Sequence, residues 1–416
     1  MDPFQSLESA VRSYSRSFPA VFDKATGSLL YDRAGRRYID FLAGAGALNY
    51  GHNHPRLKRA LLEYIERDGI THSLDLATEA KQHFMESFQS VILRPRDLTY
   101  RFQFTGPTGA NGVEAALKLA RKVTNRRNVV SFTRAFHGLS SGALAVTANS
   151  FYRGESYVNR ADVSFLPYDG YYEGIDTIPL ITKALTDLAS GIDHPAAVLV
   201  ETVQSEGGIH VAKSGWLRSL QELCKRHGIL FIVDDIQVGN GRTGEYFSFE
   251  NAGLKPDIVV LSKSVGGFGL PMTLLLIKPE FDVWSPGEHT GTFRGNNLAF
   301  VAGAEALNFW ETDVFAESLR AKGRLVDQRL RAIADQLPES VTEVRGRGLI
   351  YGLAMRTPEM AARVRADAFQ SGLIVELCGA NSDVVKVLPP LTTEDSILEE
   401  GLDVLAAAIH RSSSEN

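Results

Sequence analysis

Two short and almost wholly apolar segments constrain the fold of this chain more than any other feature. The first, Ile229–Val233, ends in the carboxylates of Asp234 and Asp235, and the second runs from Ile258 to the amine of Lys263. Apolar runs of this length without alternating polar residues are typical of strands that are buried on both faces of a parallel sheet. Because parallel strands end at a common edge, we expect an acid and an amine on one rim of one sheet.

Strands and helices alternate along most of the chain. Further strands are predicted at Arg101–Phe104, Val129–Phe132, Ala196–Val200 and Leu274–Ile277. Helices are predicted at Leu57–Arg67, Thr78–Ile92, Val113–Val123 (capped by Thr108 or Asn111) and Trp216–Arg226. This alternation predicts an α/β fold in which helices cover both faces of a mostly parallel sheet.

The end of the chain has a different character. A long helical section, Phe300–Leu337, leads to strands within Val344–Arg356 and Gly372–Leu391 and to helices at Pro358–Gln370 and Leu398–His410. These elements predict a smaller α+β C-terminal domain. We therefore expect three parts: an N-terminal segment, 1–45, that packs with the small domain and contains a hairpin at Leu29–Asp40, a large domain at 46–310, and the small domain at 311–416.

Composition excludes several classes of partner. The 416 residues carry a net charge of −5 and show no cluster of Lys and Arg with interleaved aromatics, which argues against nucleic-acid binding. No apolar run approaches the ~18 residues of a membrane span, and the N-terminus lacks the pattern of a signal peptide. Cys224 and Cys378, far apart in sequence, are expected to be reduced structural thiols. Together these features predict a cytoplasmic protein without a membrane or nucleic-acid partner.

The expected acid–amine pair suits one cofactor, pyridoxal 5'-phosphate (PLP). PLP chemistry needs a lysine that bonds the cofactor and a carboxylate that keeps the pyridine nitrogen protonated. Asp234 could instead be satisfied by backbone amides, and Lys263 could be a solvated loop residue. The loop Thr105–Asn111 lies between a strand and a helix, where glycines and a helix N-terminus can hold a phosphate.

Nine segments together resemble the class III (ω-amino-acid) aminotransferases, which are PLP-dependent transferases of fold type I. They are Gly51–Pro55, Glu114–Arg121, Phe136–Gly138, Glu201–Gly208, Asp234–Gln237, Gly241–Gly244, Leu261–Lys263, Gly291–Phe293 and Arg345–Gly348. Any one of them alone is a weak signal, but their order and spacing agree over nearly the whole chain. The resemblance implies PLP as cofactor.

The resemblance also implies roles for individual residues. Lys263 and Asp234 are the expected catalytic pair, with Lys263 also moving a proton between substrate and cofactor. The residues expected to hold the cofactor are Gly109 and Ala110 at the phosphate, Ile236 and Phe136 on the two ring faces, Gln237 at the phenolic oxygen, and Thr292 from a neighbouring subunit. His137 is either a ring contact or a buried histidine with its own partner. A shared site implies a homodimer or a dimer of dimers.

Departures from the family pattern narrow the substrate. An arginine that many members carry after the Phe-His-Gly element is Leu139 here, and an arginine that pairs with the equivalent of Glu206 is Lys386. This resembles the subgroup of L-2,4-diaminobutyrate–2-oxoglutarate aminotransferases of ectoine biosynthesis. The matching segments are Val11–Pro19, Phe41–Gly51, Arg67–His72, Phe104–Gly109 and Pro286–Asn297. The subgroup implies that glutamate and L-aspartate 4-semialdehyde give diaminobutyrate and 2-oxoglutarate, for ectoine or for a siderophore or other secondary product.

Both substrates carry carboxylates, so at least one cation must bind them. We expect Arg294 or Arg16 to do so, with Lys386 in support beside Glu206. Three alternatives stay open: an ω-aminotransferase for ornithine, 4-aminobutyrate or acetylornithine; an aminomutase of the glutamate-1-semialdehyde type; and a PLP-binding regulator, for which no DNA-binding module is evident.

Overall fold

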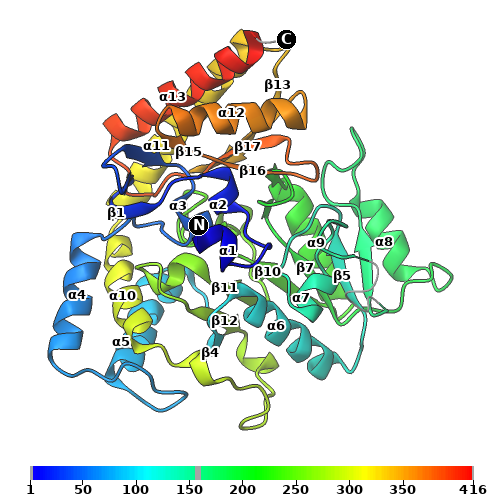
Figure 1. The fold of residues 1–416 in the computed structure, drawn as a ribbon. Coiled ribbons are helices and arrows are strands. Elements are labelled where there is room, and N and C mark those ends of the chain that lie inside the picture. The colour runs from blue at the N-terminus through cyan, green and yellow to red at the C-terminus, as the bar shows by residue number, and fades with distance from the viewer. Residues whose placement is uncertain (1–2, 155–160, 415–416) are drawn as a thin grey trace.

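A seven-stranded sheet forms the centre of the molecule (Figure 1). The computed structural model describes residues 3–154 and 161–414. In spatial order the strands are β4 (Arg101–Gly106), β12 (Thr273–Ile277), β11 (Ile258–Leu261), β10 (Leu230–Asp234), β7 (Ala197–Val200), β5 (Val129–Phe132) and β6 (Val163–Leu166). Only β12 runs antiparallel to its neighbours in this sheet. The predicted mostly parallel sheet is therefore confirmed, and β6 is a strand that the sequence did not predict.

Helices cover both faces of this sheet, as the α/β pattern predicts. On one face, α6 (Gly109–Thr124) and α7 (Ser141–Ala145) pack on side chains such as Leu199 and Ile232. On the other face, α5 (Glu79–Ser87), α8 (Ile178–Thr186), α9 (Ser214–Arg226) and α10 (Asn297–Leu307) pack on alternate residues such as Val200 and Val233. Consecutive strand residues point to opposite faces, so a continuous apolar run serves both cores.

Two helix boundaries differ from the sequence prediction for local reasons. Helix α6 begins four residues earlier than expected, because the Thr108 backbone amide donates to Asn111 Oδ1 at 3.2 Å and closes a capping box. The helix predicted over Thr78–Ile92 keeps α-geometry only as far as Ser87 and continues as a π-turn, Phe88–Leu93. Among the described residues, no helix is long and apolar enough to cross a membrane.

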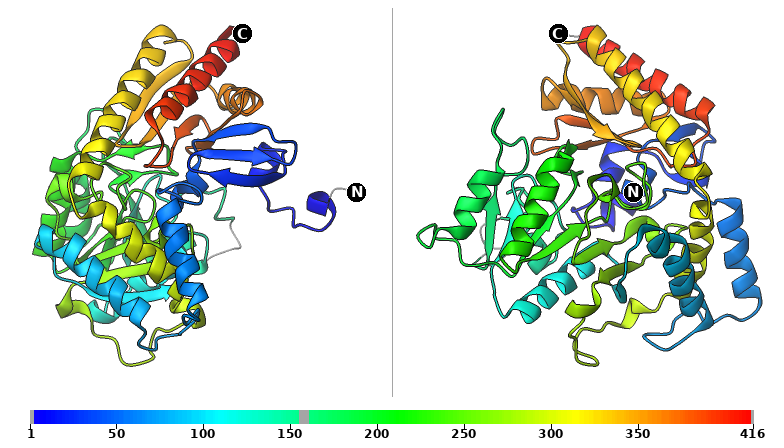
Figure 2. Two further views of the ribbon diagram at one scale, coloured as in Figure 1. Left: turned by 90° about the vertical axis from the view of Figure 1, so that its left-hand side faces the viewer. Right: turned by 180° about the vertical axis from the view of Figure 1, so that it is seen from behind.

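The N-terminal strands share a sheet with a strand from near the other end of the chain. Strands β1 (Phe22–Thr26), β2 (Leu29–Asp32) and β3 (Arg37–Asp40) form an antiparallel meander, and β15 (Leu373–Ile374) pairs with β3 in parallel. The predicted hairpin is confirmed as β2 and β3. Before the meander, α1 (Pro3–Ser6) stands off from the body of the molecule, whereas α2 (Tyr14–Ser17) lies against it (Figure 2).

A second four-stranded sheet lies in the C-terminal region, and its strands are antiparallel. Its order is β13 (Val341–Arg347), β14 (Ile350–Met355), β17 (Val384–Val387) and β16 (Glu376–Cys378). Helices α11 (Val314–Gln336), α12 (Pro358–Gln370) and α13 (Asp395–Ser414) accompany it (Figure 2). The expected α+β character is confirmed, and the division of the chain at residues 45 and 310 stays a prediction.

One buried arginine ties the loop that carries the N-terminal side of the site to the C-terminal region. Arg242 is fully buried, and its guanidinium donates to Asn49 Oδ1 at 2.6 Å and to the carbonyl oxygen of Leu349 at 2.9 Å. Asn49 in turn accepts from the amide of Leu391 through its own carbonyl, at 2.7 Å. These bonds hold Asn49, which follows the short helix α3 (Ala43–Gly46), to the C-terminal region.

Replacing this arginine tests its structural role. Arg242→Met keeps much of the side-chain volume but leaves buried oxygen acceptors without donors, so the free energy of unfolding should fall by about 2–4 kcal/mol. Unfolding in urea, monitored by tryptophan fluorescence, measures this free energy. Arg226→Met, at an exposed position on α9, is the control and should change stability by less than about 0.5 kcal/mol. Equal stability of the two variants would contradict the role assigned to Arg242.

Candidate active site

A cavity of about 170 Å³ opens at the carboxyl ends of β10 and β11. Nine of the residues named from the sequence line it: Gly109, Ala110, Phe136, His137, Glu206, Asp234, Ile236, Gln237 and Lys263. Lys386 lies next to it, in contact with Glu206. Thr292, Arg294 and Arg16 do not line it. One chain thus brings together the expected ring, phosphate and lysine positions but not the expected arginines.

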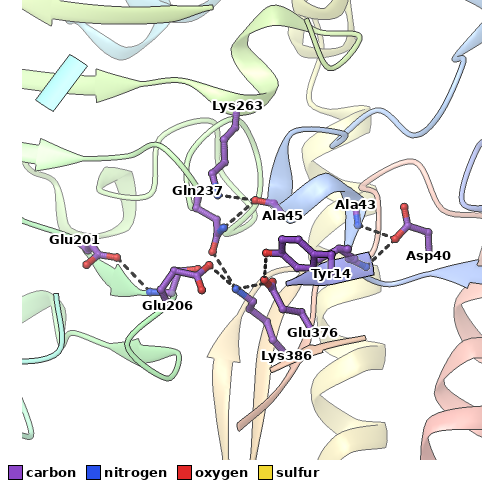
Figure 3. A network of polar contacts seen from close by, with 12 residues as sticks. Tyr14, Asp40, Ala43, Ala45, Glu201, Glu206, Gln237, Lys263, Glu376 and Lys386 are labelled. Carbon is purple, nitrogen blue, oxygen red and sulfur yellow. Dashed lines mark hydrogen bonds and ion pairs between the residues drawn. The ribbon is translucent and has the colours of Figure 1, made fainter. Parts of the chain in front are cut away.

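The pairing of β10 with β11 places the acid and the amine. The strands are parallel, with Asp234 opposite Val260, so Lys263 follows its strand three residues beyond the position level with the acid. The backbone of Lys263 takes a left-handed conformation, φ +52°, which turns the chain away from the strand direction. Its Nζ donates to the carbonyl oxygen of Ala45 in α3 at 2.6 Å (Figure 3). The same carbonyl accepts from Gln237 Nε2 at 2.8 Å.

The surroundings of Lys263 favour a neutral amine. Burial lowers the pKa of its ammonium from 10.5 to about 8, and the neighbouring charge of Lys386 acts in the same direction against the opposing effect of Glu206. A lysine that titrates near neutrality can both attack a carbonyl carbon and carry a proton.

A histidine holds the acid on the opposite side of the cavity. His137 Nδ1 lies 2.7 Å from Asp234 Oδ2, and the amide of Ile236 donates to Asp234 Oδ1 at 3.1 Å. Burial lowers the pKa of His137, but the bond to Asp234 outweighs it and the net shift is upward. Of the two sequence interpretations, the buried histidine with its own partner is the one that the geometry shows, because its partner is the acid.

A second buried acid, Glu201, was missed by the sequence reasoning. Its carboxylate accepts from the amides of Phe136 at 3.0 Å and Ser205 at 3.3 Å, and so fixes the aromatic residue that lines the cavity. Burial raises its pKa to about 7. Its sequence signals were its place after an apolar strand, as for Asp234, and its position at the start of the family-like segment Glu201–Gly208.

The cavity fits the phosphate and ring of PLP. Gly109 and Ala110 begin the 16-residue helix α6, whose first amides and dipole favour an anion. A Cβ on Gly109 would lie 2.8 Å from Ile236 Cδ1, so a larger residue here would displace the Ile236 side chain that lines the cavity. Thr105 Oγ1, near the end of β4, is buried and has no hydrogen-bond partner within the part of the chain that the structure describes. Gly109 and Ala110 thus offer an anion site in a cavity that Phe136 and Ile236 also line.

A buried ion network borders the cavity on the side of the C-terminal sheet (Figure 3). Lys386 on β17 is fully buried, and its Nζ lies 2.6 Å from Glu206 Oε1 and 2.9 Å from Glu376 Oε2. The hydroxyl of Tyr14 on α2 donates to the other oxygen of Glu376. Burial raises the pKa of Glu206, but Lys386 and Lys263 more than reverse this and the net shift is downward.

Glu376 and Tyr14 were also missed from the sequence. Glu376 lies directly opposite Lys386 across the β16–β17 ladder, a position that favours opposite charges. The sequence does place the charged Glu376 between the apolar residues Val375 and Leu377, and this pattern could have indicated a buried charge with a partner. Tyr14 gave none, because its contact spans 362 positions of the chain.

The expected carboxylate-binding arginines lie elsewhere. Arg16 is exposed on α2 and donates to the carbonyl oxygens of Arg12 at 3.0 Å and Ala10 at 3.3 Å. Arg294 donates to Thr290 Oγ1 at 3.0 Å, in the same 3-10 turn, Thr292–Arg294, as the exposed Thr292. Both Thr292 and Arg294 thus belong to a surface turn of this chain.

Comparisons with known proteins agree with this geometry. The family model for aminotransferase class-III matches residues 10–409. In solved structures, the ornithine aminotransferase from Toxoplasma gondii superposes with a TM-score of 0.86 at 26% identity, over 99% of this chain and 94% of that one. Another structure of that enzyme, with a TM-score of 0.85 at 26% identity, has PLP at partial occupancy in its active site.

The fold and the cavity define a PLP-dependent aminotransferase. This chain belongs to the class III aminotransferase family. Two relatives carry the name diaminobutyrate–2-oxoglutarate transaminase. The protein from Wolinella succinogenes is 54% identical over 98% of this chain and 95% of its own length, and the protein from Streptomyces anulatus is 56% identical over 98% and 97%.

The lowered pKa of Lys263 predicts how the cofactor-free protein takes up PLP. Only the neutral amine bonds an aldehyde, so the rate of uptake should rise about tenfold per pH unit below pH 8 and level off above it. The rise of the visible absorption band in a stopped-flow mixer measures this rate. Lys225→Met, which removes an exposed lysine, should leave the midpoint unchanged. A midpoint near 10.5 would contradict the effect of burial.

Proposed function

We propose that this enzyme transfers an amino group from L-glutamate to L-aspartate 4-semialdehyde, giving L-2,4-diaminobutyrate and 2-oxoglutarate. The observation that carries the proposal is the 54–56% identity, over nearly the full chain, to proteins named for the diaminobutyrate reaction. The buried pair Lys386–Glu206 at the edge of the cavity supports it, because a lysine there departs from the arginine of many family members.

In this proposal the two catalytic residues act on opposite sides of the ring. Asp234, oriented by His137, holds the proton of the pyridine nitrogen, and Lys263 holds the cofactor and moves a proton at its Nζ. PLP, when bound, supplies an electron sink for the substrate carbon that loses its proton. Glutamate leaves its amino group on the enzyme, 2-oxoglutarate departs, and the aldehyde then receives that group.

The other proposed contacts combine the family resemblance with the lining of the cavity. Gly109 and Ala110 would hold the phosphate through their amides, Phe136 and Ile236 would cover the ring faces, and Gln237 would bond the phenolic oxygen. Thr292 and Arg294, on a surface turn, serve the site of a second copy, so the proposed assembly is a homodimer or a dimer of dimers. Arg294 or Arg16, with Lys386 in support, is the proposed cation for the carboxylate next to the reacting carbon of glutamate.

The reaction serves ectoine biosynthesis in this proposal, in the cytoplasm. Diaminobutyrate supply for a siderophore or another secondary product is the second candidate. A general ω-aminotransferase for ornithine, 4-aminobutyrate or acetylornithine is the runner-up activity, favoured by the structural similarity to ornithine aminotransferase. Leu139 and Lys386 count against it, because they replace arginines that such enzymes carry.

A direct assay tests the reaction. Purified protein with PLP should convert aspartate semialdehyde and glutamate to diaminobutyrate and 2-oxoglutarate, both followed by chromatography. Ornithine, 4-aminobutyrate and acetylornithine should react far more slowly. Lys263→Ala should lower kcat by at least about 10³-fold and abolish the visible band of the bound cofactor. A preference for ornithine over diaminobutyrate would reject the proposed substrate and favour the runner-up.

Hybrid assemblies test the shared site. Lys263→Ala and Thr292→Ala subunits each give impaired homodimers, but a hybrid contains one site that carries neither change. With random pairing of equal amounts, about a quarter of wild-type activity should return. Activity no higher than the average of the two parent homodimers would contradict a contribution of Thr292 to a neighbouring site. Arg294→Ala in place of Thr292→Ala extends the test to the proposed carboxylate contact.

A further inference from the structure

A second cavity, of about 490 Å³, lies beside the cofactor cavity and shares two of its walls, Phe136 and Glu206. Its other walls include Arg134 and Arg153, the aromatic rings of Tyr152 and Tyr171, and Gly379 from the C-terminal region. The ring of Tyr152 meets that of Phe136 edge-on, with centroids 5.5 Å apart. A substrate attached to the cofactor would therefore pass Phe136 and Glu206 to reach this space.

Two arginine side chains, Arg134 and Arg153, line the second cavity. The Arg134 guanidinium lies 5.1 Å from the centre of the Tyr171 ring, and its Nη1 is 3.3 Å from His210 Nδ1. Within residues 3–154 and 161–414 Arg134 forms no ion pair with a carboxylate. The Arg153 guanidinium lies 5.2 Å from the centre of the Phe165 ring. Glu206, on the shared wall, is paired with Lys386, which also pairs with Glu376.

The neighbouring groups respond to these arginines. Burial, together with the charges of Arg345 and Arg134, lowers the pKa of His210 to about 3, so the imidazole beside Arg134 is neutral. Burial and Arg345 lower the pKa of Arg134 against the opposing effects of Tyr171, Glu343 and Asp383. An anion that entered the cavity would be attracted by the guanidiniums on its wall.

The two substrates of the proposed reaction share one geometric feature. In diaminobutyrate the reacting carbon, C4, is three bonds from the carboxylate carbon C1. In glutamate the reacting carbon, C2, is likewise three bonds from the distal carboxylate carbon C5. A single anion subsite at a fixed distance from the reacting carbon therefore serves both halves of the reaction. At the position where many family members carry an arginine, this chain has Leu139, whose surface is 53% exposed.

We propose that the second cavity binds the carboxylate that lies three bonds from the reacting carbon of either substrate, with Arg134 and Arg153 as its cations. This inference rests on the proposed function, because it takes diaminobutyrate and glutamate as the substrates. Arg134, packed over Tyr171, presents a planar guanidinium suited to a carboxylate. The roles of the cations are then divided, since Arg294 or Arg16, with Lys386 in support, is left for the second carboxylate of glutamate, next to its reacting carbon.

The experiment compares amines with and without that carboxylate. Diaminobutyrate, glutamate and 1,3-diaminopropane, which is diaminobutyrate without its carboxylate, are each mixed with the PLP-loaded enzyme, and the visible band reports the first half-reaction. Arg134→Gln and Arg153→Gln should each lower kcat/KM for the two amino acids about 10- to 100-fold, the effect of a lost charge-assisted hydrogen bond. The value for 1,3-diaminopropane should stay within about twofold, since no bond to it is lost.

Controls separate the possible outcomes. Arg127→Gln, which removes an exposed arginine from the same domain, should leave all three amines unchanged. Arg134→Lys should recover part of the lost kcat/KM, because the ammonium keeps the positive charge but not the two parallel hydrogen bonds of a guanidinium. Equal loss on all three amines, or no loss in either variant despite wild-type turnover of diaminobutyrate, would overturn the assignment of the second cavity. Wild-type enzyme that ignores diaminobutyrate would instead reject the proposed function on which it rests.

Discussion

The site depends first on the parallel pairing of β10 and β11. Neither strand has a polar residue before its end, so the register that buries both also aligns their final residues at one edge. Asp234 and Lys263 then face a common cavity although 28 residues separate them in sequence. A one-residue slip would reverse the faces of one whole strand and expose its apolar side chains to the wrong core. The positions of the two reactive groups therefore follow from the packing of the sheet.

Buried charge determines the chemistry of the rest of the site. Lys386 lies between Glu206 and Glu376, and such a group keeps its charge in an apolar interior only when partners surround it. Its positive field, added to burial, favours the neutral form of Lys263. The three residues come from two parts of the fold, because Glu206 follows β8 (Val203–Gln204), whereas Glu376 and Lys386 belong to the paired strands β16 and β17. The pKa of Lys263 therefore reaches its lowered value only when the C-terminal sheet has packed beside the large sheet.

Sequence reasoning succeeded where a local pattern determines the outcome. The strand ends at Asp234 and Lys263, the helix cap at Thr108 and the hairpin at Leu29–Asp40 all follow from neighbouring residues. It missed β6, an edge strand of modest apolar character, and it missed contacts between distant segments, such as Tyr14 with Glu376. The cations of the second cavity were missed for the same reason. Arg134 and Arg153 look like ordinary loop cations in sequence, and only the folded chain places them around one cavity.

Part of the ion network beside the cavity depends on Tyr14, which lies on a short helix near the N-terminus. It sits in a helix of four residues, none of them buried, and 47% of its own surface is exposed, yet its hydroxyl bonds a carboxylate in the innermost ion network. None of the four sheets contains a residue of α2. A protease that clipped the chain just after α2 would leave those sheets intact while admitting water to Glu376. Loss of chemical competence would then precede loss of the fold, and natural variation in this short stretch offers a route to new amine preferences at little cost in folding.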